Sequence, residues 1–136
     1  MKGTIVPLPE FSNPDTLLDP PGPYSQVVRV GDLVFVSGQV GSTNDGVLVG
    51  PGVNEQCDQA LRNIGLALES VGLTLDHVAK VSLYVAYPED MGSLVPHMDE
   101  SFPNFFTNGF PASTLTIVQR LFDPGFRIEI DAIAHA

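Results

Sequence analysis

The chain has 136 residues, 43% of them hydrophobic, and 16 acidic against six basic residues give it a formal net charge of -10. A chain of this length forms one domain, residues 1–136, and can bury enough apolar surface for a core. The negative charge argues against nucleic acid as a partner, because binding phosphate groups depends on clustered basic side chains, which here are scattered singly.

The cysteine count and the hydropathy pattern further limit the class of protein. Cys57 is the only cysteine, so no internal disulfide and no multi-cysteine metal site is expected. The first residues show no apolar run followed by a small-residue cleavage site, and no stretch approaches the roughly 18 apolar residues of a membrane span. We therefore expect a soluble, cytoplasmic protein with no membrane partner.

The first part of the chain predicts strands and a long loop. Residues 3–6 favour a short strand, whereas residues 7–23 favour a loop because their prolines lack the amide donors that a helix or central strand needs. Residues 27–30 and 33–37 predict a β-hairpin around the two-residue turn Gly31-Asp32.

An amphipathic helix is the strongest pattern, and it follows a glycine-rich loop at 40–52 that we expect to be mobile. Apolar residues recur at helical spacing over four turns: Cys57, Ala60, Leu61, Ile64, Ala67, Leu68 and Val71. Asn54 is the predicted N-cap, and Gly72 follows the helix where a positive φ is favoured. Cys57 is on the apolar stripe, and we expect it to pack in the core.

A second strand–helix pair follows. Residues 79–87 alternate with the period of a half-buried strand, and residues 91–106 keep a helical spacing of apolar side chains. Two prolines interrupt this helix. We expect Pro96 in its first turn, where a missing amide costs little, and Pro103 to kink or shorten its end.

The last two predicted strands are residues 113–118 and 126–134, joined through a turn at Asp123-Pro124-Gly125. The element order is βββ-α-β-α-ββ, which predicts an α+β domain with one mixed sheet and both helices on one of its faces. In the final strand, apolar residues on one face alternate with Arg127, Glu129 and Asp131 on the other. Charges on an uncovered sheet face suggest a cavity or a subunit interface, so we expect an oligomer.

Several short motifs occur in a fixed order: GPYSQ at 22–26, VSGQ at 36–39, QALRN at 59–63, FPAST at 110–114 and IEIDA at 128–132. Together they resemble the RidA/YjgF family of small enamine and imine deaminases over about residues 22–134. The resemblance implies a chorismate-mutase-like fold, a homotrimer, and three clefts between neighbouring subunits. It also implies hydrolysis of reactive enamines or imines to carbonyl products and ammonia, with no metal and no cofactor.

The resemblance also assigns roles to individual residues. Glu129 matches the carboxylate that holds or activates the attacking water, and Tyr24 matches a tyrosine on one side of the cleft. Ser37 and Gly38 match residues near the cleft floor, and Leu115 matches a position whose backbone carbonyl faces the substrate. From the residues alone, Glu129 is equally interpretable as a buried glutamate that fixes the assembly.

The sequence departs from the family pattern at Ser113, where the deaminases carry an arginine. An arginine binds a carboxylate through two charge-assisted hydrogen bonds, whereas serine offers one neutral donor. We therefore expect a substrate other than a standard 2-imino acid, with Ser113 altering substrate choice. Arg127 shares a face with Glu129 and is the better candidate to replace the guanidinium, ahead of Arg120, although a structural ion pair is the preferred explanation for Arg127.

Two functions from different classes remain open. The first is a hydrolase of the deaminase type that acts on a small reactive enamine, imine or related carbonyl metabolite. The second is a trimer on the same scaffold that binds a small molecule or a partner without catalysis. A ribonuclease activity is disfavoured by the net charge of -10. A serine-hydrolase triad is also disfavoured, because the three histidines fall in loops, the second helix or the terminus.

Overall fold

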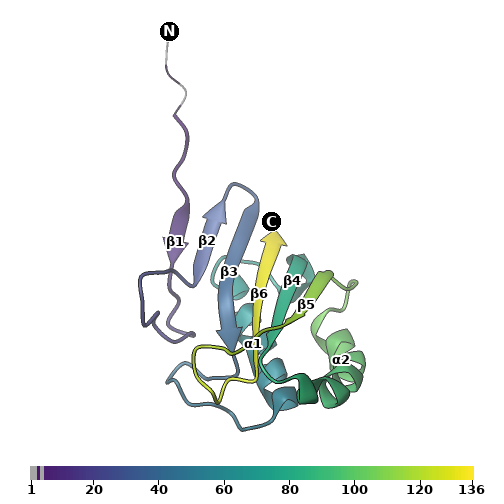
Figure 1. Ribbon diagram of the computed structural model, residues 1–136. Helices are drawn as coiled ribbons and strands as arrows, with labels where there is room; N and C mark the ends of the chain where they lie inside the picture. Colours follow the sequence, from purple (N-terminus) through teal and green to yellow (C-terminus); the bar gives the residue numbers. More distant parts are fainter. Residues whose placement is uncertain (1–2, 4) are drawn as a thin grey trace.

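A single six-stranded sheet in the order β1-β2-β3-β6-β4-β5 organises the computed structural model, which describes residues 3 and 5–136 (Figure 1). The strands are β1 Glu10–Ser12, β2 Val27–Val30, β3 Leu33–Val40, β4 Val78–Val85, β5 Ala112–Ile117 and β6 Ile128–His135. The helices are α1 Val53–Glu69 and α2 Met91–Phe105, with short 3-10 turns η1 Leu75–His77 and η2 Pro88–Asp90.

The sheet is mixed, as predicted. Only the outer pair β4 and β5 is parallel, and every other neighbouring pair is antiparallel. The hairpin between β2 and β3 turns at Gly31, which has a φ of 57°. None of the helices in the described part of the chain combines the length and apolar character that crossing a membrane requires.

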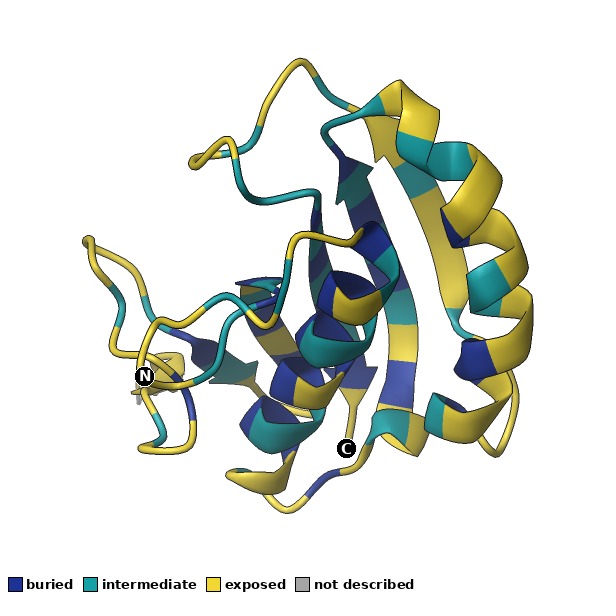
Figure 2. Cartoon of the chain, turned by 90° about the horizontal axis from the view of Figure 1, so that it is seen from below, coloured by how far each residue is buried: buried dark blue, intermediate teal, exposed yellow. Residues whose placement is uncertain are grey.

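Both helices cover the same face of the sheet, and the opposite face is left open (Figures 1 and 2). The core lies between helices and sheet, because α1 buries its apolar stripe against alternate side chains of β3 and β6. Cys57 is fully buried in this layer, and burial, together with the nearby Asp58, raises the pKa of its thiol to about 12. The predicted packing role of Cys57 is thus confirmed.

The first strand lies elsewhere than predicted. Residues 3, 5 and 6 are in no strand, and position 4 of the expected strand is outside the described residues. Instead, β1 forms inside the predicted loop 7–23, where Phe11 pairs with Val28 on the outer edge of β2. Pairing with an available sheet edge is a tertiary effect that the proline-rich sequence does not reveal.

The caps of α1 also differ from the prediction. The helix starts one residue before Asn54, because Gly52 is the N-cap and its N–H donates to the Glu55 carboxylate at 2.8 Å. At the other end, Gly72 has the expected positive φ of 79°. The N–H of Leu73 donates to the Leu68 carbonyl at 2.9 Å, which completes a Schellman motif.

Helix α2 runs through both prolines. Pro96 lies in the second turn rather than the first, and Pro103 does not end the helix, which continues to Phe105. Both rings are exposed and lie two turns apart on the outer side of the helix. The carbonyls that lose an amide partner, those of Gly92 and Asp99, belong to exposed residues and can be solvated, which lowers the cost of each interruption.

Candidate functional site

A β-bulge at the centre of the sheet places the predicted cleft-floor residues. The pairing of β3 with β6 shifts between Val36, opposite Ala132, and Gln39, opposite Ile130. Ser37 and Gly38 therefore both lie opposite Asp131, the single residue of β6 between Ile130 and Ala132. The Ser37 hydroxyl donates to the Ser25 carbonyl at 2.5 Å, and its N–H donates to the Gln26 carbonyl at 2.9 Å. These bonds tie the GPYSQ motif to the VSGQ motif.

The side chain of Glu129 packs directly on this bulge. A Cβ atom built on Gly38 would lie 2.8 Å from Cδ of Glu129 and 3.1 Å from its Oε1. Glu129 pairs with Tyr84 of β4 and alternates with buried Ile128 and Ile130, so its side chain is on the open face of the sheet. Glycine at position 38 is what gives the carboxylate room to lie there.

The surroundings of Glu129 favour its protonated form. Partial burial raises the pKa of its carboxyl above the ordinary value, and the charge of Asp131 raises it further. Tyr24 is close to this carboxylate. Partial burial raises the pKa of the Tyr24 phenol, and Glu129 adds to the effect. The site therefore combines a carboxylate whose proton affinity is increased with a phenol that stays protonated.

Buried amide side chains beneath the site were missed as functional candidates. Gln39 donates through Nε2 to Oε1 of Gln26 at 2.8 Å and to the Ser37 carbonyl at 3.0 Å. Asn63 of α1 donates to the Val40 and Ser42 carbonyls at 3.1 and 2.8 Å. Both glutamines are 5% exposed and belong to the short motifs, which was the available signal. They border a cavity of about 70 Å³ that Tyr24 and Gly38 also line.

Ser113 and Leu115 are not brought to Glu129 within one chain. They pair with Val81 and Leu83 of β4, whose side chains are buried on the helix-covered face. Glu129 is on the opposite face, on the next strand but one. Ser113 is exposed, and Leu115 packs against the core. If Ser113 contributes to the same site as Glu129, it therefore does so from another copy of the chain.

Arg127 is engaged by neighbours other than Glu129. Its Nε donates to Oδ2 of Asp90 at 2.8 Å, and its Nη2 donates to Oδ1 at 3.0 Å. The guanidinium also lies 4.0 Å from the ring centre of Tyr87. Arg120 donates to the backbone carbonyls of Leu121 and Phe122, both at 3.1 Å. A substrate-binding role for either arginine stays a prediction.

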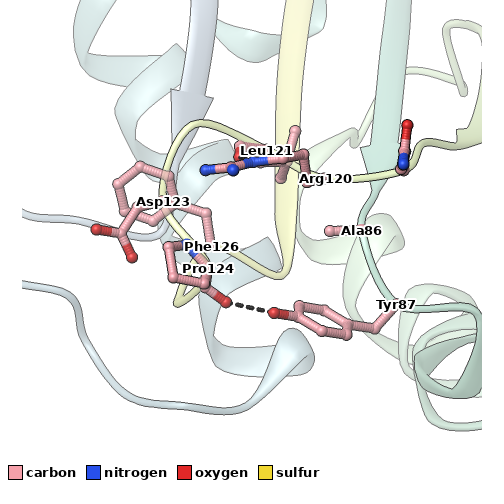
Figure 3. A pocket seen from close by; sticks show the side chains of 8 residues that line it. Ala86, Tyr87, Arg120, Leu121, Asp123, Pro124 and Phe126 are labelled. Atoms are coloured by element: carbon pink, nitrogen blue, oxygen red, sulfur yellow. Dashed lines mark hydrogen bonds between the residues drawn. The ribbon is translucent and has the colours of Figure 1, made fainter.

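Two larger cavities lie away from these residues. One of about 210 Å³ is bounded by Tyr87, Arg120 and Phe126, and its wall is closed by the Tyr87 hydroxyl, which donates to the Pro124 carbonyl at 2.6 Å (Figure 3). The other, of about 270 Å³, borders Asp76 and Phe105. Over residues 3 and 5–136, no cluster of three or more histidine, cysteine or acidic side chains is arranged to hold a metal ion.

The fold and the motifs together define an α+β domain of a known family. The family model described as Endoribonuclease L-PSP matches residues 15–136. A mouse 2-iminobutanoate/2-iminopropanoate deaminase is 38% identical over 114 residues, which cover 83% of this chain and 81% of that protein. A RutC family protein of Pyrococcus abyssi is 34% identical over 117 residues, 85% of this chain and 88% of that protein.

Solved structures agree with the sequence matches. The crystal structure of the YjgF gene product of Escherichia coli superposes with a TM-score of 0.83 at 28% identity, covering 93% of this chain and 98% of that one. The chain belongs to the Endoribonuclease L-PSP family, also called the RidA/YjgF family. The family expected from the sequence motifs is thus confirmed.

Proposed function

We propose that this protein is a homotrimer that hydrolyses a small reactive enamine, imine or related carbonyl metabolite, with Glu129 activating water in a cleft between subunits. The observation that carries the proposal is the carboxylate of Glu129, half-buried over the Gly38 bulge with Tyr24 beside it. The deaminase names of the relatives support the same reaction class.

The chemistry requires a base and a proton donor in one place. Ionised Glu129 accepts a proton from water while the oxygen bonds to the C=N carbon, and the nitrogen takes up a proton. In the resulting carbinolamine, Glu129 takes the hydroxyl proton and passes a proton to the amine nitrogen as the C–N bond breaks, which releases ammonia and leaves the carbonyl product. A carboxylate with an increased proton affinity is a stronger base for the first step and carries the proton that the leaving nitrogen needs. The Tyr24 phenol supplies a neutral hydrogen-bond donor at the edge of this site.

The open sheet face supports the oligomer. Phe11, Val28, Phe35 and Ile133 pair in register across β1, β2, β3 and β6, and form an apolar row on this face. Phe11 is 65% and Phe35 is 39% exposed in the single chain. A second copy packed on this face would remove these side chains from water. For Ser113 to serve the site of a neighbouring subunit, the edge strand β5 of one copy must also approach Glu129 of the other.

Ser113 bears on the choice of substrate. Because it is an exposed serine at the position of the family arginine, it offers no charge to an anionic group. We therefore infer a substrate that lacks the carboxylate of a 2-imino acid. The same substitution supports the second candidate, a trimer that binds a small molecule or a partner without catalysis. The ribonuclease activity that the family description names is disfavoured by the net charge of -10. We place the protein in the cytoplasm.

Ammonia release separates the two candidates. Freshly generated imines with and without a carboxylate are offered to the wild-type protein and to Glu129→Gln, which keeps the shape of the side chain and removes its charge. We expect the wild type to release ammonia from imines without a carboxylate, and the variant to lose about 100-fold or more of kcat/KM with its oligomeric mass intact. Equal background rates for both proteins on every imine would favour the binding protein instead.

A further inference from the structure

Two further polar side chains lie beside Glu129 on the open sheet face. Tyr84 of β4 is the register partner of Glu129, and the next residue pair on that face joins Ser82 to Asp131. The Tyr84 hydroxyl crosses between the pairs and donates to Oδ2 of Asp131 at 3.2 Å. Both residues are half-buried in the single chain.

We propose that Asp131 and Tyr84 are a pair of positioning residues that control when Glu129 holds its proton: Asp131 through its negative charge, and Tyr84 by hydrogen-bonding Asp131. The inference rests on the proposed function, since it deepens the role of Glu129. It assigns a purpose to the second carboxylate of the IEIDA motif.

Asp131 is the charged residue among the groups that surround Glu129. From β3, Glu129 faces the uncharged residues Gly38 and Val40. From the loop before β2, the Tyr24 phenol is near enough for the charge of Glu129 to raise its pKa, and from β4 the register partner is Tyr84. Asp131 is therefore the charged group that acts on Glu129, and its effect adds to that of burial in raising the carboxyl pKa.

The nearby basic side chains are held by partners other than Asp131 and Glu129. Lys80, on the same face of β4, directs its Nζ to the Thr114 hydroxyl at 2.7 Å and the Val81 carbonyl at 3.4 Å. Arg127, which precedes β6, is held in its two-bonded pair with Asp90.

Tyr84 modulates the charge of Asp131. The negative charge of Asp131 is the main cause that raises the pKa of the Tyr84 phenol, so the hydroxyl stays protonated and remains a donor. The hydrogen bond that the Tyr84 hydroxyl donates spreads part of the negative charge of the Asp131 carboxylate. It therefore weakens the repulsion that Asp131 exerts on Glu129 without removing it.

Substitutions of the two residues are consequently expected to shift the ionisation of Glu129 in opposite directions. Asp131→Asn removes the repulsion, so Glu129 ionises at lower pH. Tyr84→Phe leaves the Asp131 charge without its donor, so Glu129 ionises at higher pH. In the double variant the Asp131 charge is absent, so loss of the Tyr84 hydroxyl has no further effect, and the result should equal that of Asp131→Asn alone.

The test uses two measurements on the full chain. The first is the pH profile of kcat/KM for imine hydrolysis, whose acid limb reports ionisation of the base in the free enzyme. We expect the limb to move to lower pH in Asp131→Asn, which raises the rate roughly threefold to tenfold below the wild-type midpoint, and to higher pH in Tyr84→Phe. The second is a ¹³C NMR titration of the Glu129 side-chain carboxyl, assigned with Glu129→Gln, which follows protonation without any substrate.

Matched controls remove a charge or a hydroxyl elsewhere. Glu100→Gln removes one negative charge from the exposed side of α2, across the sheet, and Tyr87→Phe removes a phenol whose bond is to Pro124. Neither should move the Glu129 titration. An unchanged titration in Asp131→Asn, or shifts of the same sign in both single variants, would overturn the inference. A shifted titration in a protein without imine hydrolysis would instead retain the pair and reject the proposed function.

Discussion

The carboxyl group of Glu129 occupies the space that any side chain at position 38 would need. The contact of 2.8 Å between Cδ of Glu129 and a Cβ on Gly38 is shorter than atoms tolerate. Gly38 does not have a positive φ, so a side chain at position 38 would disturb this contact with Glu129 and not the backbone conformation. The bulge in β3 and the carboxylate on β6 thus form one structural unit.

Gly38→Ala should displace the Glu129 carboxylate while the backbone is retained. A shift on the order of 1 Å in a catalytic group costs about 100-fold in rate, so we expect kcat to fall by that order with a small change in KM. Steady-state kinetics measure kcat and KM, and circular dichroism checks that the backbone fold is retained. Gly92→Ala is the control, because a Cβ on Gly92 meets no atom within 4 Å. Full activity of Gly38→Ala would show that the carboxylate position is not needed.

The free energy of unfolding should depend on pH through Glu129. Its pKa is raised in the folded state, so the folded chain binds the proton more tightly than the unfolded chain does. Its contribution to stability is therefore greatest below the ordinary pKa of 4.5 and is lost as pH rises through the higher folded value. Glu129→Gln should remove this pH dependence and unfold at higher urea than the wild type at neutral pH. Urea titrations at one protomer concentration, across pH, measure the difference.

Ser113→Arg should restore recognition of a carboxylate. Because Ser113 is exposed on edge strand β5, the longer side chain can be accommodated without burying its charge. We expect kcat/KM for carboxylated imines to rise about tenfold to a hundredfold, the value of a two-bonded charged contact, with no gain on imines that lack the group. Ser113→Gln, which is long but uncharged, is the matched control. A gain of equal size on both substrate types would contradict a carboxylate contact.

Arg127→Lys distinguishes a structural from a substrate-binding arginine. Lysine cannot make both bonds to Asp90, so we expect a loss of about 1 kcal/mol in the free energy of unfolding, discounted for the partial exposure of the pair. KM should stay the same, since the guanidinium is already engaged by Asp90 and Tyr87. Arg62→Lys, at an exposed arginine of α1, is the control. A raised KM at wild-type stability would instead support the substrate-binding role predicted from the sequence.

Local patterns along the sequence were sufficient for most elements. The alternation of residues 27–36 and the turn at Gly31 predict the hairpin, and the apolar stripe around Ile64 predicts α1, because each depends on spacing within one segment. The alternation in β6 also placed Glu129 and Asp131 on the open face correctly. There are two exceptions. Strand β1 forms because the edge of β2 is available for pairing, and α2 continues through Pro96 and Pro103 because both prolines lie on its solvent-facing side.

The sequence by itself determined the element order, the family and the identities of Glu129, Tyr24 and Gly38 as candidates, because short motifs and periodicity are local properties. Only the tertiary structure decided how these residues meet. The close contact of Glu129 with Gly38 and the bond from Tyr84 to Asp131 join residues that are far apart in the sequence, 47 positions in the second case. Such contacts depend on which strands pair and in which register, and sheet pairing is settled by the packing of the whole core.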